Sequence, residues 1–137
     1  MVKIYTDGAC SGNPGRGGWA AIIINGEKIE KISGASENTT NNRMELIAVI
    51  SALKYVKDQN IELYTDSKYA KDGIEKWILN WKKNGWKTAS KQDVKNIDLW
   101  QNLDQLNQIK NVKWNWVKGH SDNEFNNMAD QLARSKI

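Results

Sequence analysis

The sequence predicts an α/β domain in which a five-stranded mixed β-sheet is flanked by helices. Three observations support this prediction. Apolar runs typical of strands occur at residues 2–7, 19–24, 61–66 and 112–117, stripes of apolar residues at helical spacing lie between the later runs, and helices alternate with strands in the second half of the chain. A chain of 137 residues can bury a core without disulfides, so we expect residues 1–137 to form one domain.

The chain is expected to begin with three strands. Residues 2–7 form the first, and a glycine-rich loop follows at residues 11–18. Residues 19–24 and 27–34 are joined by Asn25-Gly26, which is a strong signal for a hairpin turn. These three strands should therefore be consecutive neighbours in the sheet.

A helix is predicted after a turn at residues 36–40. Thr40 is a suitable N-cap, and the apolar residues that follow at helical spacing are Leu46, Val49, Ile50, Leu53 and Val56. The strand at residues 61–66 comes directly after this helix. A crossover through a helix should place that strand parallel to a neighbour in the sheet.

The remaining elements are two helical regions, a strand and a last helix. Residues 67–84 are helical, with an interruption at Gly73 and an end at Asn84-Gly85. A helix at residues 96–106 follows, and then a strand at 112–117. The last helix covers residues 123–135, with Phe125, Met128 and Leu132 on its apolar side.

Positive charge is concentrated in one segment. The chain has a net charge of +4, and residues 76–95 contain six lysines and one aspartate. A local basic patch is typical of a surface that binds a polyanion. The alternative is a lysine-rich face that is merely solvated.

Several classes of protein are disfavoured. No apolar run approaches the ~20 residues of a membrane helix, and residue 1 leads directly into a strand rather than an apolar signal segment. The single cysteine, Cys10, cannot form an internal disulfide, which fits a reducing compartment. We therefore expect a cytoplasmic protein without membrane contact.

Two aspartates mark the candidate site. Asp7 and Asp66 each end a strand with the sequence Tyr-Thr-Asp. If the strands are parallel neighbours, both carboxylates lie at the same end of the sheet, where each opposes ionisation of the other unless a cation or a shared proton is present. The simpler interpretation is that Asp7 favours the turn before Gly8 and that Asp66 caps a helix.

Two further carboxylates can reach this end of the sheet. Glu45 lies near the start of the first helix, and Asp130 lies on the last helix, off its apolar side. Four such oxygen ligands suit a hard cation such as Mg²⁺ or Mn²⁺. The only histidine, His120, follows the last strand; it is either idle or an auxiliary group that handles protons.

Several motifs together resemble type 1 ribonuclease H. They are the runs at residues 5–10, 12–15, 40–46, 65–67, 77–86, 95–100 and 117–120. The resemblance covers nearly the whole chain in order, and it includes the basic protrusion of the bacterial-type enzymes. It implies a ribonuclease H-like fold.

The resemblance implies an endonuclease that hydrolyses the RNA strand of RNA–DNA hybrids. Two Mg²⁺ ions, with Mn²⁺ as a possible substitute, would be held by Asp7, Glu45, Asp66 and Asp130. His120 would assist proton transfer or product release. The products would carry 5′-phosphate and 3′-hydroxyl ends, and the enzyme would act as a monomer without an obligate protein partner.

The same resemblance implies three sets of substrate contacts. The RNA strand would meet Gly12, Asn13, Asn41 and Asn42, and a phosphate of the DNA strand would meet Thr40 and Asn96. The protrusion would contribute Lys82, Lys83 and Lys87. Trp77 and Trp81, at helical spacing, are expected to pack within the protein rather than to stack on bases.

Two other functions are compatible with a nucleic-acid-binding α/β domain. One is a module that binds hybrids without cutting them, which the presence of all four carboxylates disfavours. The other is a related nuclease that acts on DNA junctions or ends, which the matches at residues 12–15 and at Asn41-Asn42 disfavour.

Overall fold

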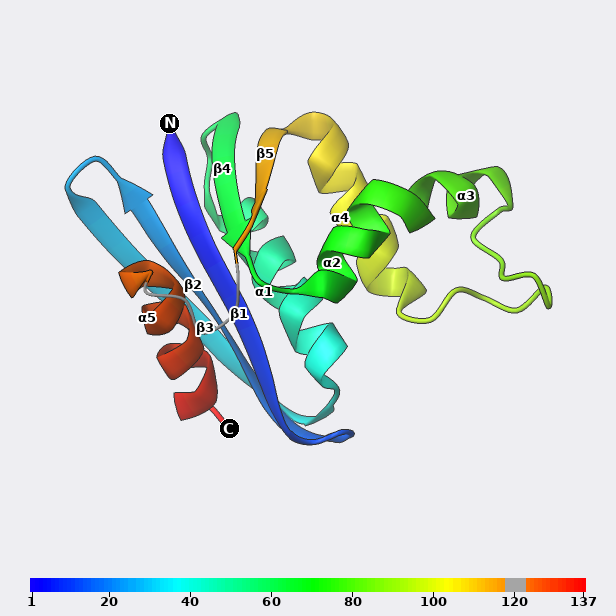
Figure 1. Ribbon diagram of the computed structural model, residues 1–137, viewed down its shortest axis with the longest axis horizontal. Helices are drawn as coiled ribbons and strands as arrows, with labels where there is room; N and C mark the ends of the chain where they lie inside the picture. Colours follow the sequence, from blue (N-terminus) through cyan, green and yellow to red (C-terminus); the bar gives the residue numbers. More distant parts are fainter. Residues whose placement is uncertain (118–122) are drawn as a thin grey trace.

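The protein folds around one twisted β-sheet (Figure 1). The computed structural model describes residues 1–117 and 123–137. The strand order within these residues is β3-β2-β1-β4-β5, and the bounds are β1 Val2–Gly12, β2 Gly15–Asn25, β3 Lys28–Thr39, β4 Asn60–Thr65 and β5 Asn111–Trp116. The first three strands are antiparallel, whereas β4 pairs parallel with both β1 and β5. The predicted mixed sheet is confirmed.

Helices cover both faces of the sheet. Their bounds are α1 Asn41–Tyr55, α2 Lys68–Asp72, α3 Ile78–Lys83, α4 Ile97–Ile109 and α5 Glu124–Ser135, and a π-helical turn, η1 (Gly73–Trp77), joins α2 to α3. In Figure 1, α1 lies behind the sheet, α4 lies to its right beyond β5, and α5 lies in front of it. The segment from α3 to the start of α4 extends away from the sheet on the right of the view.

Strand alternation produces two cores. Ile4 points into the larger core, which includes residues of α1, β4 and α4, whereas its neighbour Tyr5 points to the opposite face. There Tyr5 packs with Ile22 and with Ala129 of α5. Because both faces are covered, β1 is buried from Ile4 to Gly8, which holds Asp7 in a fixed position.

The glycine-rich segment at residues 11–18 is not the loop that we predicted from the sequence. Strand β1 continues to Gly12 and β2 begins at Gly15, so only Asn13 and Pro14 lie between the two strands. Pairing between β1 and β2 satisfies the backbone in this hairpin. At Gly17 a Cβ atom would lie 2.5 Å from Thr39 Cγ2, so close packing rather than flexibility explains a glycine at this position.

The turn predicted at residues 36–40 is also mostly strand. Strand β3 runs to Thr39, which pairs with Gly15 of β2. Local turn signals at these positions are overridden because β2 offers a continuous partner for the backbone. The helix prediction is confirmed, since α1 begins at Asn41 and the Thr40 hydroxyl accepts a hydrogen bond from the Arg43 N–H at 3.2 Å.

The predicted interruption at Gly73 takes the form of the π-helical turn η1. A Cβ atom at Gly73 would lie 1.9 Å from Cη2 of Trp100, a fully buried side chain of α4. The helix can therefore cross α4 closely only with glycine at this point. Trp77 and Trp81 pack against the Trp100 ring with centroid distances of 6.4 Å and 5.5 Å, which confirms that they are packing residues.

No helix among the described residues is long and apolar enough to cross a membrane.

Candidate active site

The register of β1 and β4 brings two aspartates together. Tyr5 pairs with Tyr64, and their rings stack with centroids 4.5 Å apart. Asp7 and Asp66 follow two residues later, so their side chains lie beside one another where β4 ends, whereas β1 continues past Asp7 to Gly12 in pairing with β2. The prediction that the two aspartates lie together is confirmed. The prediction that Asp7 ends its strand is wrong, because β2 continues to pair with β1 as far as Gly12.

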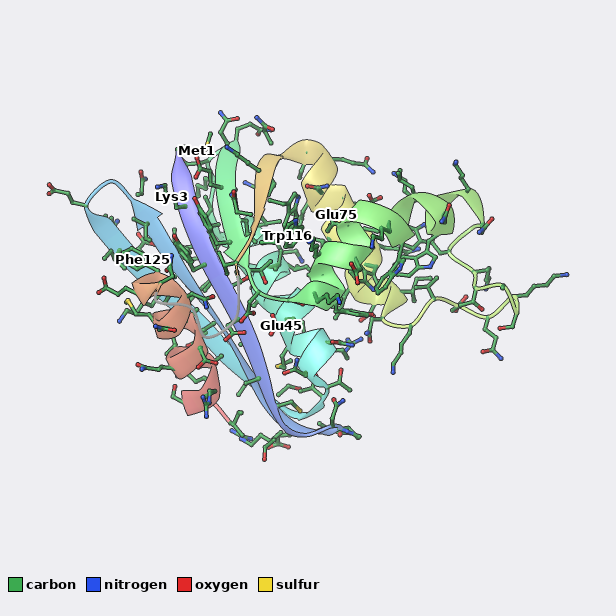
Figure 2. All side chains as sticks on the ribbon, in the orientation of Figure 1. Met1, Lys3, Glu45, Glu75, Trp116 and Phe125 are labelled. Carbon is green, nitrogen blue, oxygen red and sulfur yellow. The ribbon has the colours of Figure 1, made fainter. Side chains whose placement is uncertain are left out.

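Glycine allows α1 to contribute a third carboxylate. A Cβ atom at Gly8 would lie 2.5 Å from the backbone nitrogen of Glu45, so only glycine permits the start of α1 to pack so closely on β1. The Gly8 N–H donates hydrogen bonds to Asp7 Oδ1 at 2.9 Å and to Glu45 Oε1 at 3.3 Å. Glu45 thus lies against the middle of β1, next to Gly8 (Figure 2).

These carboxylates open into a polar pocket of about 320 Å³. Asp130 reaches the pocket from α5, on the opposite face of the sheet from α1. The lining residues are Asp7, Gly8, Asn41, Asn42, Glu45, Asp66, Ser67, Lys68, Tyr69, Asn126, Asn127 and Asp130. We call Asp7, Glu45, Asp66 and Asp130 the acidic pocket; the structure brings together all four carboxylates that the sequence singled out.

Burial strongly perturbs two of these carboxyls. Asp7 and Glu45 are each only 6% exposed. Burial, with the negative charge of Asp66 and contact with Asp130, raises the pKa of Asp7 to about 7, although hydrogen bonding with Glu45 and Gly8 partly opposes this rise. Burial and the adjacent Asp7 raise the pKa of Glu45 well above its ordinary value. Without a cation, the two groups therefore hold a proton near neutral pH.

The donor set fits a hard divalent cation. One ligand oxygen from each of Asp7, Glu45 and Asp66 lies within 4.8 Å of the others. Glu45 Oε2 is buried and has no hydrogen-bond partner among the described residues, which is costly for a carboxylate oxygen unless an ion or a proton satisfies it. Clustered carboxylates with an unsatisfied buried oxygen are suited to Mg²⁺ or Mn²⁺.

Two of the residues predicted to contact RNA are hydrogen-bonded to one another. The Asn13 side chain in the β1–β2 turn accepts a hydrogen bond from the Asn41 N–H at 3.2 Å. Asn41 and Asn42 are exposed at the start of α1 and line the pocket. The hairpin tip, including Gly12, therefore lies beside the helix start, although these residues are far apart in the sequence.

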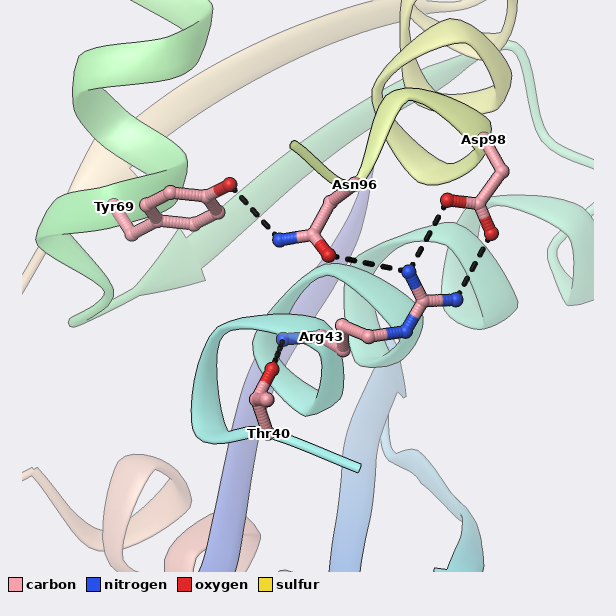
Figure 3. A network of polar contacts seen from close by, with 5 residues as sticks. All are labelled: Thr40, Arg43, Tyr69, Asn96 and Asp98. Carbon is pink, nitrogen blue, oxygen red and sulfur yellow. Dashed lines mark hydrogen bonds and ion pairs between the residues drawn. The ribbon is translucent and has the colours of Figure 1, made fainter. Parts of the chain in front are cut away.

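The two predicted phosphate contacts are linked through a residue that the sequence analysis did not select. Arg43 donates to Asn96 Oδ1 at 3.2 Å, and its N–H binds Thr40 Oγ1 (Figure 3). Arg43 also forms a two-pronged contact with Asp98, at 3.1 Å and 2.9 Å, which lowers the pKa of Asp98. Tyr69 completes the network by accepting from Asn96 Nδ2 at 3.0 Å.

No signal in the sequence distinguished Arg43 or Tyr69 as members of the site. Arg43 is one charged residue among many in a helix, and its partners lie 53 and 55 positions away. Tyr69 follows Asp66 by three residues, but its role depends on contact with Asn96 and Trp100. Such pairings arise only when α1, α2 and α4 pack together.

The basic segment at residues 76–95 extends beyond the sheet (Figure 1), and we call it the basic projection. Its three predicted substrate contacts differ in their surroundings. Lys82 lies 3.4 Å from Asp104 and Lys87 is paired with Asp93, whereas Lys83 has no ion pair among the described residues. All three side chains are exposed.

The predicted role of His120 stays a prediction, because this residue lies outside the described residues. The chain is described up to Val117, whose N–H donates to Thr65 O at 3.0 Å. It is described again from Asn123, whose side chain caps α5 by accepting from Phe125 and Asn126.

The sequence also matches known families over its whole length. The profile of the RNase H family matches residues 1–137. The chain is 56% identical to a ribonuclease H of Acetivibrio thermocellus, over 99% of this chain and 94% of that protein. It is 59% identical to a ribonuclease H of Ehrlichia canis with the same coverage of the two chains.

Solved structures show the same architecture. LC9-RNase H1, a type 1 RNase H with the type 2 active-site motif, superposes with a TM-score of 0.84 at 32% identity, over 98% of this chain and 70% of that chain. LC11-RNase H1, solved in complex with an RNA/DNA hybrid, superposes with a TM-score of 0.70 at 22% identity, over 100% and 96% of the two chains. The predicted ribonuclease H-like fold is confirmed.

Proposed function

Because this chain belongs to the RNase H family, we propose that it is a metal-dependent endoribonuclease that cleaves the RNA strand of RNA–DNA hybrids. The observation that carries the proposal is the acidic pocket, in which carboxylates from three separate segments lie within 4.8 Å of one another. The hybrid-bound relative supports the choice of substrate, as do the exposed asparagines at the pocket rim.

Asp7, Glu45, Asp66 and Asp130 would hold two divalent ions, which we infer to be Mg²⁺, with Mn²⁺ as a substitute. When bound, such ions supply Lewis acidity at the scissile phosphate, which favours attack by water and departure of the 3′ oxygen. The products then carry 5′-phosphate and 3′-hydroxyl ends. The chain's own contribution is a rigid arrangement of negative charge, fixed by β1, β4, α1 and α5.

The protein residues have distinct tasks in this scheme. Burial holds Asp7 and Glu45 in place and favours retention of a proton, so a cation that binds at neutral pH would have to displace that proton. Asp66 and Asp130, which are only partly buried, border the side open to solvent. His120 would assist proton transfer or product release, and His120→Ala should slow the reaction without abolishing it.

Recognition of a hybrid requires contacts to both strands. Only RNA offers 2′-hydroxyl groups, and Asn13, Asn41 and Asn42 present amide groups that both donate and accept hydrogen bonds. Thr40 and Asn96 would meet a phosphate of the DNA strand, and lysines of the basic projection would meet further phosphates. We propose that the protein acts as a monomer in the cytoplasm.

The direct test is cleavage of a hybrid with a labelled RNA strand, with Mg²⁺ and with a chelator. We expect RNA fragments with 5′-phosphate ends only when Mg²⁺ is present. Duplex DNA and duplex RNA of the same sequence serve as controls. Binding without cleavage would favour the hybrid-binding module, and preferential cutting of duplex DNA or junctions would favour the related nuclease.

A further inference from the structure

The hydrogen-bond network at the start of α1 has a fixed polarity. An arginine guanidinium carries only donors, so the atom of Asn96 that faces Arg43 must be its carbonyl oxygen. The structure agrees, because Arg43 Nη1 lies 3.2 Å from Asn96 Oδ1 (Figure 3). Asp98 holds the guanidinium in place through two bonds of 3.1 Å and 2.9 Å.

The amide nitrogen of Asn96 is thereby directed to the other side. One of its two hydrogens goes to the Tyr69 hydroxyl at 3.0 Å. The Tyr69 oxygen also accepts from Trp100 Nε1 at 3.0 Å, so its own hydrogen is left for another acceptor. Within the described parts of the chain, no acceptor is bound to that hydroxyl hydrogen or to the second amide hydrogen of Asn96.

Thr40 follows the same pattern. Its hydroxyl oxygen accepts from the Arg43 N–H at 3.2 Å, which leaves the hydroxyl hydrogen to donate. The acceptor atoms of Thr40 and Asn96 are therefore both occupied by Arg43, one by its backbone and one by its side chain. Thr40 and Asn96 therefore expose hydrogen-bond donors, which suit the anionic oxygens of a phosphodiester.

We propose that Arg43 is a positioning residue that fixes the amide orientation of Asn96, so that a donor rather than an acceptor meets a phosphate of the DNA strand. This inference rests on the proposed function, because it requires a nucleic-acid substrate. Without Arg43, the Asn96 side chain could turn over, since the Tyr69 hydroxyl can donate to its carbonyl oxygen. The substrate phosphate would then face an acceptor.

The first test is steady-state cleavage of a hybrid by Arg43→Met. We expect KM to rise about tenfold, the loss of roughly one hydrogen bond to a charged group, while kcat at saturating substrate changes less than about threefold. Lys28→Met is a control with the same loss of charge, because Lys28 pairs with Glu30 at the opposite end of the sheet, and it should leave KM unchanged. A fall in kcat with unchanged KM would overturn the proposal.

The second test locates the phosphate. Hybrids with one neutral methylphosphonate at successive positions of the DNA strand are compared in the unmodified protein and in the variants. At one position, the methylphosphonate should weaken binding of the hybrid to the unmodified protein but not to Arg43→Met. Arg43→Lys retains a donor toward Asn96, so it should retain this sensitivity even if its stability is lower. Identical profiles for the unmodified protein and Arg43→Met would refute the assigned role.

If Arg43→Met fails to fold, Asn96→Asp tests whether residue 96 must present a hydrogen-bond donor to the phosphate. A carboxylate keeps an acceptor toward Arg43 and can accept from Tyr69, so the variant should fold with an unchanged or higher melting temperature. It presents an oxygen to the phosphate, and we expect KM to rise at least tenfold. Unchanged KM would overturn the proposal, whereas failure of the unmodified protein to cut any hybrid would instead refute the proposed function.

Discussion

The acidic pocket and the basic projection both concentrate charge, but they are assembled differently. The carboxylates of the acidic pocket come from four separate segments between residues 7 and 130, and two of them are almost fully buried. The lysines of the basic projection come from one continuous segment, and they are exposed. Burial makes charges in the pocket interact strongly, whereas solvent screens the lysines.

This difference has consequences for each region. Removal of one carboxylate should abolish a function that needs several ligands at once, while removal of one lysine should change binding only gradually. The position of the basic projection is held by packing at its base, where Trp77 and Trp81 contact Trp100, rather than by its charges.

Asp7→Asn should lower the rate of hybrid cleavage by at least about 10³-fold, because Asp7 is one of the buried ligands proposed for the ions. The same change should preserve or raise the unfolding free energy of the metal-free protein at pH 7.5, since it relieves repulsion with Glu45 and Asp66. Cleavage assays and denaturant unfolding measure the two effects. Asp58→Asn, an exposed carboxylate outside the pocket, is the control; near-normal turnover of Asp7→Asn would contradict the ligand assignment.

Gly73→Ala should destabilise the protein by about 2–3 kcal/mol, because the new methyl group collides with the Trp100 ring. Helix propensity alone predicts the opposite sign, a gain of up to about 1 kcal/mol. Thermal or urea unfolding decides between them. Asn80→Ala, an exposed position in α3, serves as the control and should change stability little.

The stability of the metal-free protein should fall as pH rises from 5 to 7.5. The pKa of Asp7 is about 7 in the folded state, against an ordinary value of 3.8, so the folded state binds more protons in this range and deprotonation favours unfolding. The loss attributable to the pocket should be about 2 kcal/mol. It is measured as the difference in slope between the unmodified protein and Asp7→Asn, and equal slopes would show that the pair holds no proton.

Replacement of Lys82, Lys83 and Lys87 by glutamine should weaken hybrid binding about tenfold at low salt and should reduce the salt dependence of log K by about 1–2. Lys83 should account for more of the change than Lys82 or Lys87, which are paired with Asp104 and Asp93. Binding measured across a series of salt concentrations tests this. An unchanged salt dependence of log K would show that the basic projection does not contact the hybrid.

The comparison also shows which features could be predicted from the sequence. The existence and order of the strands, the cap at Thr40 and the lysine-rich segment follow from local patterns, and the structure agrees with them, although β1 and β3 extend beyond their predicted ends. The glycine-rich loop and the turn at residues 36–40 were predicted wrongly, because local glycine and turn signals were outweighed by pairing of β2 with β1 and β3. Local patterns do not reveal which strand will offer a partner.

From local patterns alone, the two Tyr-Thr-Asp runs and the lysine-rich segment that carries the net positive charge could be recognised. Tertiary structure alone decided that Gly8 admits Glu45 to the first strand, that burial raises the pKa of Asp7 to about 7 and that Arg43 joins Thr40 to Asn96. The physical reason is that ionisation and hydrogen-bond polarity depend on neighbours in space and on the exclusion of water. Both properties therefore depend on the packing of helices against the two faces of the sheet.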